Sequence, residues 1–366
     1  MKTNMRRIYT IGTTMAFVGA IIMSMSASLT RAAEDGPFVI RDTVMIRADR
    51  MLRYWKVPNQ DDYWSWIPQM SFYIKGNIGT GSKVLVDFTT ADGKLWYTTT
   101  AVTENYGNPE LTQVVVNDVK GHMDERATIS TGVFGYKITV RNALSGTNQV
   151  LMSGKFKVGK FHVGPDLPAN RFKYEYYVDQ DWTLPIGYLF LNTKDNASAP
   201  ALVAGMWFRG NELDNTKLAA YIFYKGEQIG STKDQSGSAG KYKSILTASP
   251  DGDAKWELWT FSWSSVRAYN VDTSANRYPD THFMDKNPGT YEIKVLRNGK
   301  LCRTASFTVG PDGKMVDSGL AAKNNINSYL VIIPVKVLGD QDGKVDLTAW
   351  QTQAFYGNPL TGFDVP

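Results

Sequence analysis

Short runs in which apolar and polar residues alternate recur along the chain, at residues 83–88, 136–140, 154–158, 219–224, 291–295 and 305–309. They are rich in β-branched and aromatic residues, and clusters of Gly, Asn, Asp and Ser separate them, as is typical of strands joined by turns. No stretch of about 12 residues carries apolar residues at helical spacing. The sequence therefore predicts an all-β protein.

The order of these runs is repeated along the chain. Residues 136–145 and 291–300 each begin with a tyrosine close behind a glycine, and each is followed by a Phe-x-Val-Gly sequence, at 156–159 and 307–310. Self-similarity of this kind is typical of a duplicated structural unit.

The repeat extends upstream, where residues 70–77 match residues 206–211. Because the order of signals is shared, we expect two tandem antiparallel β-sandwiches, copy 1 over residues 37–164 and copy 2 over residues 166–312. The single cysteine, Cys302, cannot form a disulfide within the chain, so stability must come from apolar cores.

Residues 287–309, with Tyr291 behind a glycine and an Asn-Gly turn, resemble the last two strands of bacterial immunoglobulin-like or fibronectin-like modules. The resemblance covers about 25 residues in each copy and does not single out one family. It implies an adhesive, spacer or ligand-binding part of an exported protein, although a fold does not fix a function.

The register of the last predicted hairpin depends on where its turn lies. A two-residue turn at 298–299 with an unbroken ladder would place Phe307 on the wrong face of the strand. A three-residue loop, 297–299, with a bulge at its glycine keeps Phe307 on the core face. In that register Cys302 points away from the core, so we expect an accessible thiol.

Residues 313–366 predict a linker followed by a C-terminal β-hairpin, which should pack on a sandwich because two strands alone are barely stable. Its turn holds Asp340 and Asp342, and Asp346 follows; together they match the middle of a calcium loop. Both ends of such a loop lack carboxylates here, so an Asp/Gly turn is the favoured interpretation and no cofactor is expected.

Residues 1–32 have the pattern of a secretory signal peptide: three basic residues, an apolar stretch at 11–25 and small residues before the cut. No later stretch is long and apolar enough to span a membrane. We therefore expect a secreted or periplasmic protein. Removal of the signal peptide takes away four of the 40 basic residues and none of the 35 acidic ones. The mature chain is therefore nearly neutral, and its charge does not indicate a nucleic-acid partner.

Residues that could carry out catalysis are sparse. The histidines His122, His162 and His282 lie far apart, and none accompanies a nucleophile motif or has metal-ligand spacing. A glycosidase or lyase would need two nearby carboxylates, for which residues 61–62 and 179–181 are candidates beside aromatic clusters.

Aromatic residues are abundant, and they gather at residues 53–66, 172–182 and 255–263. In the third cluster, Trp259, Phe261 and Trp263 alternate onto one face, as core residues of a sandwich do. Packing explains most of these residues, because aromatic side chains bury large areas. The alternative is a platform for sugar rings or a protein, with Trp64, Trp66 and Trp182 as candidates.

Copy 2 is longer than copy 1 by 21 residues, and the excess falls around residues 264–283. Long loops on a rigid sandwich are usually functional or disordered, and the aromatic content argues against disorder. Candidate ligand-binding residues in it are Arg267, Tyr269, Arg277, Tyr278 and His282. A cover for an exposed sheet edge is the structural alternative.

Together these features favour an exported, non-catalytic binding, adhesive or structural protein, with a cell-surface or extracellular glycan or protein as partner. The alternative is a carbohydrate-active enzyme on a β-sandwich scaffold. The sequence leaves the ligand and the oligomeric state open.

Overall fold

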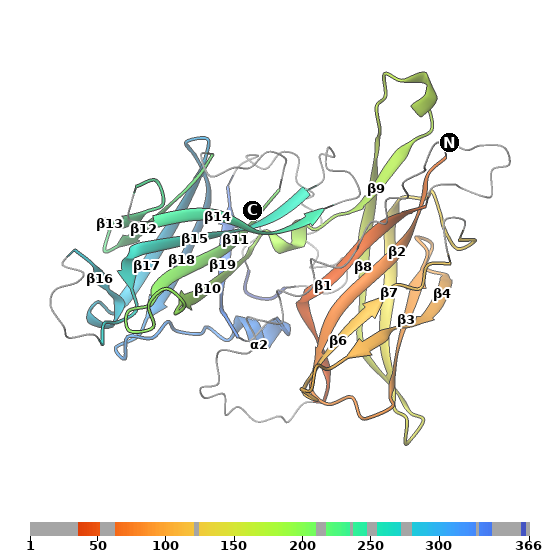
Figure 1. Ribbon diagram of the computed structural model, residues 1–366, viewed down its shortest axis with the longest axis horizontal. Helices are drawn as coiled ribbons and strands as arrows, with labels where there is room; N and C mark the ends of the chain where they lie inside the picture. Colours follow the sequence, from red (N-terminus) through yellow and green to blue (C-terminus); the bar gives the residue numbers. More distant parts are fainter. Residues whose placement is uncertain are drawn as a thin grey trace, which may run out of the picture. The chain divides into compact units, whose positions relative to one another are not determined.

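The computed structural model describes residues 36–51, 63–120, 124–209, 217–234, 237–246, 255–271, 280–326, 329–338 and 360–363. Within these ranges the chain is all-β, as the alternation predicts, and its strands form three sheets (Figure 1). The helical segments there are single short turns: η1 (Pro168–Asn170), η2 (Asp181–Thr183), η3 (Met284–Lys286) and α2 (Leu320–Asn324). The signal peptide prediction, at residues 1–32, lies outside the described residues.

Two sheets form the first module, in the orders β1-β2-β6-β5 and β4-β3-β7-β8-β9. Their strands are β1 (Phe38–Met51), β2 (Ser65–Lys75), β3 (Lys83–Thr89), β4 (Leu95–Thr100), β5 (Val102–Glu104), β6 (Leu111–Val116), β7 (Gly132–Arg141), β8 (Asn148–His162) and β9 (Tyr174–Val178). Alternate residues of the longer strands are buried between the two sheets, for example Val84, Val86 and Phe88 of β3, none of which is exposed to solvent.

One large sheet forms the second module, in the order β13-β12-β17-β18-β19-β10-β11-β15-β14, with β16 beside β15. Its strands are β10 (Ile186–Asn192), β11 (Ala201–Arg209), β12 (Leu218–Tyr224), β13 (Glu227–Ser231), β14 (Gly237–Leu246), β15 (Lys255–Arg267), β16 (His282–Phe283), β17 (Gly289–Arg297), β18 (Lys300–Val309) and β19 (Val331–Val337). The edge strands β13 and β14 follow each other in the chain, so the short link between them draws the two edges together. The sheet therefore curls into a nearly closed barrel around its own apolar core.

The strand orders of the two modules match. The order β1-β2-β6-β5 corresponds strand by strand to β10-β11-β15-β14 in the second sheet. The order β4-β3-β7-β8-β9 corresponds in the same way to β13-β12-β17-β18-β19. The repeat seen in the sequence is thus accompanied by the same order of strands in space.

Strand β19 joins the two halves of the second sheet. Its first residues pair with β10, from Val331 opposite Leu189 to Pro334 opposite Ile186, and its later residues pair with β18, starting at Val335. The change of partner occurs at Pro334, which has no N–H to give to a ladder. Residues 331–337 therefore lie inside the sheet, and the turn and second strand of the expected hairpin lie outside the described residues.

Two strands that follow the residue ranges expected for the two copies pair with the sheets of those copies. Strand β9 pairs with β8 from Val158–Val178 to His162–Tyr174, so the first module continues past residue 164. Strand β19 carries the second module past residue 312. Each of these strands covers an edge of β8 or β18 that would otherwise expose unpaired backbone groups.

The β17–β18 hairpin differs from the expected register. Asn298 and Gly299 have φ of 52° and 79°, as the two central residues of a tight two-residue turn require. The ladder then shifts so that Val295 pairs with Arg303, and Cys302 becomes the extra residue of a β-bulge. The bulge therefore lies within β18, not in the loop.

This bulge reverses the expected orientation of the cysteine. Phe307 stays on the core face as expected, but Cys302 is fully buried, with Sγ 3.3 Å from the carbonyl oxygen of Val295. The prediction of an accessible thiol was wrong because it assumed strict alternation along β18. In β8 of the first module, Leu151 is the extra residue at the corresponding place, between Met152 opposite Ile138 and Val150 opposite Thr139.

We expect Cys302 of the folded protein to resist a maleimide reagent, because its thiol is buried, and to react once the chain is unfolded in urea. The control is Ser306→Cys, which places a thiol at an exposed position of the same strand. Labelling of the native wild-type protein at the rate of the Ser306→Cys variant would contradict the bulge.

Candidate functional site

Two of the three tryptophans proposed as ligand platforms are part of the core. Trp66 has no exposed surface, its indole donates to the carbonyl of Ser130 at 2.9 Å, and its ring meets Phe134 edge-on at 4.9 Å. Trp182 is 3% exposed and donates to the side chain of Gln180 at 2.9 Å. Neither ring offers a free face to a ligand.

The third aromatic cluster is also internal, as its spacing predicts. Trp259, Phe261 and Trp263 of β15 are at most 1% exposed and lie in the core of the second module. Their expected position on the core face is confirmed.

Half-exposed aromatic side chains gather instead where β8 and β9 extend beyond the other strands of the first module. Figure 1 shows this hairpin extending beyond the strands beside it. We call residues 159–177 the β8–β9 arm. Half-buried or exposed side chains at its end, with two from just before β2, form what we call the arm surface: Tyr63, Trp64, Lys160, His162, Arg171, Phe172, Lys173 and Tyr174.

The rings of the arm surface stack in pairs. Tyr63 and Phe172 are 4.6 Å apart with planes 10° from parallel, and His162 and Tyr174, which face each other across the β8–β9 ladder, are 4.8 Å apart at 18°. The main chain of Trp64 is held to the arm because its carbonyl accepts the hydroxyl of Tyr176 at 3.3 Å. Segments far apart in sequence thereby form one surface.

Each of three rings on this surface carries a cation. Lys160 Nζ lies 4.4 Å from the ring centre of Tyr174, the Arg171 guanidinium 4.9 Å from that of Phe172, and Lys173 Nζ 5.9 Å from that of Trp64. Such contacts are worth about 0.5–1 kcal/mol at exposed sites and hold flexible side chains in place.

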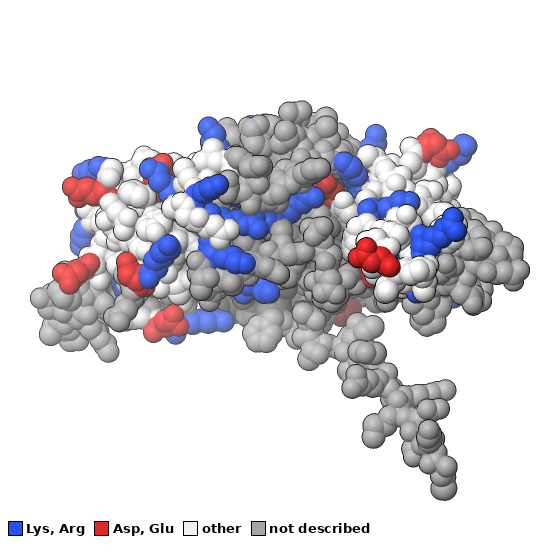
Figure 2. All heavy atoms as spheres, turned by 90° about the horizontal axis from the view of Figure 1, so that it is seen from above, with Lys and Arg blue, Asp and Glu red and all other residues white. Residues whose placement is uncertain are grey.

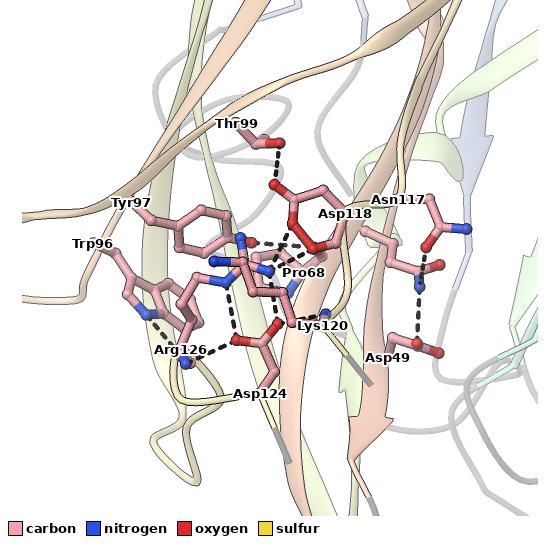
Figure 3. A network of polar contacts seen from close by, with 11 residues as sticks. Asp49, Pro68, Trp96, Tyr97, Thr99, Asn117, Asp118, Lys120, Asp124 and Arg126 are labelled. Carbon is pink, nitrogen blue, oxygen red and sulfur yellow. Dashed lines mark hydrogen bonds and ion pairs between the residues drawn. The ribbon is translucent and has the colours of Figure 1, made fainter. Parts of the chain in front are cut away.

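The most extensive described polar network lies in the loop between β6 and β7 (Figure 3). The guanidinium of Arg126 donates to both carboxylate oxygens of Asp124, at 2.9 and 2.6 Å, and to a carboxylate oxygen of Asp118 at 2.6 Å. Thr99 of β4 donates to Asp118 at 2.7 Å, and the backbone N–H of Lys120 donates to Asp124 at 2.9 Å. The network ties the exit of one sheet to a strand of the other.

Ring contacts complete this network. The guanidinium of Arg126 lies 4.7 Å from the ring centre of Tyr97, and the indole of Trp96 donates to the carbonyl of Arg126 at 2.9 Å. Figure 3 shows Asp118 and Asp124 both facing this one arginine. Burial raises the pKa of the Tyr97 hydroxyl, which therefore stays protonated.

Burial by itself would raise the pKa of Asp124, but hydrogen bonds from Arg126 and from backbone N–H groups outweigh it and lower the pKa to about 2. Hydrogen bonding from Arg126 also lowers the pKa of Asp118. Both groups are therefore ionised and committed to Arg126 at neutral pH, which suits an ion pair that closes a loop better than an acid or base.

The acids at 179–181 are buried too. Asp181 has no exposed surface; it accepts the indole N–H of Trp256 at 2.9 Å and the guanidinium of Arg209 at 3.3 Å. Asp179 is 7% exposed and accepts the backbone N–H of Asp181 at 2.8 Å. This cluster joins the modules and offers no open acid–base pair; residues 61–62 lie outside the described residues.

The insertion of copy 2 is anchored at both ends. Arg267 donates to the carbonyls of Ala199 and Ser264, and β16 runs parallel to the end of β15, with His282 opposite Val266. Tyr269 is 37% exposed. Arg277 and Tyr278 lie outside the described residues, as do the weak calcium candidates Asp340, Asp342 and Asp346.

His282 belongs to a hydrogen-bonded corner at the start of β17. The hydroxyl of Tyr291 donates to the carbonyl of Asn287 at 2.7 Å, so the ring N–H of His282 at Nε2 must donate to that hydroxyl, 2.8 Å away. Burial lowers the pKa of His282. The described ends of the insertion therefore bond to the strands of the second module, and residues 272–279 lie outside the described residues.

The remaining described features add little chemistry. An open hollow of about 320 Å³ near β7 and β8 is lined mainly by neutral polar groups such as Asn77, Asn142 and Gln149, with no titratable side chain. Within the described ranges, no three His, Cys, Asp or Glu side chains come close enough together to hold a metal ion. No helical segment in that part of the chain has the length and hydropathy to cross a membrane.

Sequence reasoning identified Trp64 and the aromatic content of the arm but missed its partners. Lys160, His162 and Lys173 were not assigned to this surface from the sequence, because they meet the aromatic rings only once β8 and β9 pair. A signal was present in principle: Lys160 and His162 have strand parity and face the aromatic residues of the next run across a hairpin.

No protein-family model matches the chain, and no curated protein matches its sequence.

Asp124→Asn should destabilise the protein by about 2 kcal/mol, because Arg126 keeps its partial burial but loses a bidentate carboxylate. Urea unfolding at pH 7 measures the change. Asp92→Asn is the matched control, since Asp92 and its partner Lys94 are both exposed, and it should leave the unfolding midpoint unchanged. Equal effects of the two substitutions would show that the Arg126 network contributes no more to the free energy of unfolding than an exposed ion pair does.

The lowered pKa of His282 predicts a pH-dependent stability. Its folded-state pKa lies below the unfolded value of about 6.5, so the contribution is complete above that pH and is lost as pH falls through the folded pKa. Thermal unfolding of wild type should occur at a lower temperature at pH 5.0 than at pH 7.5, and His282→Gln should reduce this difference. An unchanged difference in the variant would exclude His282 as its source.

Proposed function

We propose that this chain is an exported, non-catalytic binding protein that holds an extracellular or cell-surface glycan on the arm surface. The observation that carries the proposal is the contrast between the described acids and the described aromatics. Asp124, Asp179 and Asp181 are buried and bonded, and the exposed Asp118 is paired with Arg126, while a cluster of half-buried stacked rings with cations over them remains partly open to solvent. Surfaces of this type recognise ligands without supplying a reactive group.

We also propose that the two modules are tandem copies of one immunoglobulin-like β-sandwich unit. The matching strand order, the bulge at Leu151 and Cys302, and the echo of residues 136–145 in 291–300 support a duplication. The bond from Tyr291 back to the carbonyl of Asn287 resembles the tyrosine corner of such sandwiches. In this interpretation β19 fuses the two sheets of the second copy, and β9 occupies the same position in the first.

A carbohydrate-active enzyme is the less favoured alternative. Glycoside hydrolysis needs two carboxyl groups on either side of an accessible bond. Asp181 has no exposed surface and is committed to Trp256 and Arg209, and Asp118 and Asp124 share Arg126. No described observation favours the enzyme.

A glycan array probed with residues 36–366 tests the proposed function, followed by an assay for new reducing ends on every glycan that is retained. We expect retention without cleavage. Release of reducing ends would replace the proposal by the enzyme alternative, and retention of no glycan would remove its glycan part.

A further inference from the structure

The cations of the arm surface have an arrangement that narrows the class of ligand. Lys160, Arg171 and Lys173 each lie over an aromatic ring, and within the described residues none of them forms an ion pair with a carboxylate. Among the described residues, these three charges are therefore held by aromatic rings and not by carboxylates. Because these side chains are already ordered, binding an anion costs less rotamer entropy than it would for free surface lysines.

The local charge contrasts with that of the chain. Between residues 153 and 178 there are five basic residues and two acidic ones, and Glu175 is 4% exposed, whereas the chain without its first 32 residues is nearly neutral. Figure 2 shows one face of the molecule, with Lys and Arg side chains close together across its middle and Asp and Glu side chains mainly toward its two ends. The basic excess of the arm itself is that of residues 153–178. Such a concentration of one sign attracts anionic partners at short range.

The ring geometry argues against stacking as the main mode of recognition. Tyr63 and Phe172 cover one another, as do His162 and Tyr174, and cations lie over Tyr174, Phe172 and Trp64. A neutral sugar ring or an unpaired base needs a free aromatic face, which is scarce here. A ligand with repeated acidic groups meets the cations directly.

Packing within the β8–β9 ladder and buried bonds at its base hold the arm in place. The ring of Tyr177 packs on the backbone of Gly159 across the β8–β9 ladder, where any larger side chain would clash. At its base, β9 leads into Asp181 and its buried partners. The cations are thus presented on a fixed two-stranded base, as preorganised recognition requires.

We infer that the arm surface binds an acidic polysaccharide, with Lys160, Arg171 and Lys173 contacting successive carboxylate or sulfate groups of the polymer. The inference rests on the proposed function and names its ligand class. Repeated acidic groups along one chain match the spaced cations and add affinity through multivalency.

The test compares immobilised polygalacturonate with the same polymer after reduction of its carboxyl groups, using residues 36–366. The arm variant is Lys160→Gln, Arg171→Gln and Lys173→Gln together. The control variant, Lys83→Gln, Lys300→Gln and Lys323→Gln, removes the same charge from exposed positions elsewhere. We expect wild type to prefer the acidic polymer and the arm variant to bind it about tenfold or more weakly than the control. Burial of Cys302, measured by maleimide labelling, checks that both variants are folded.

Each other outcome overturns the inference in a different way. Equal binding to the reduced polymer, or equal loss in the two variants, removes the acidic ligand or the arm assignment while glycan binding itself stands. Tighter binding to single-stranded DNA than to polygalacturonate would mean a nucleic-acid surface. If neither this test nor the array retains any glycan, the glycan part of the proposed function fails as well.

Discussion

The buried carboxylate of Asp181 is the interaction on which the relation between the modules depends. A carboxylate without exposed surface is costly unless it is paired, and the cost of an unpaired one is several kcal/mol. Its partners, Arg209 of β11 and Trp256 of β15, belong to the second module, while the chain that carries it comes directly from β9 of the first. Arg209 also lies 5.4 Å from the ring centre of Trp256, so the three groups satisfy one another. The residues from Asp179 to Ile186 are consequently all buried, and one apolar cluster continues from the first module into the second.

A second constraint is that sheet edges need to be covered. In the first module β9 covers the edge of β8, and in the second module β19 covers β18 and then turns to β10 at Pro334. In both cases the covering strand comes from sequence that follows the module's other strands. The arm follows from this arrangement, because β8 and β9 pair along a length that carries them beyond the neighbouring strands.

The two polar centres of the first module divide the tasks of stability and recognition. In the Arg126 network both carboxylates bond to the one guanidinium, so their oxygens are occupied within the loop. On the arm surface the cations contact rings, and none of them pairs with a carboxylate among the described residues, so in the proposed function they are the groups that meet a partner. Electrostatic complementarity of this kind contributes more to the choice of partner and the rate of association than to stability.

The sequence by itself determined the all-β class, the repeat and the core positions of Trp259, Phe261 and Trp263, because period-two alternation reports which side chains share a face of a strand. It did not determine the inward orientation of Cys302, since one extra residue in β18 reverses the face, and Cys302 then lies in the apolar core that the curled sheet encloses. Trp64 and Trp66 look alike in sequence, yet one is half-exposed and the other fully buried. The arm surface, likewise, exists only once β9 pairs with β8 and brings Tyr174 opposite His162. Alternation is a local property of one strand. The partner and register of a strand depend on contacts between distant segments, so only the tertiary structure decided them.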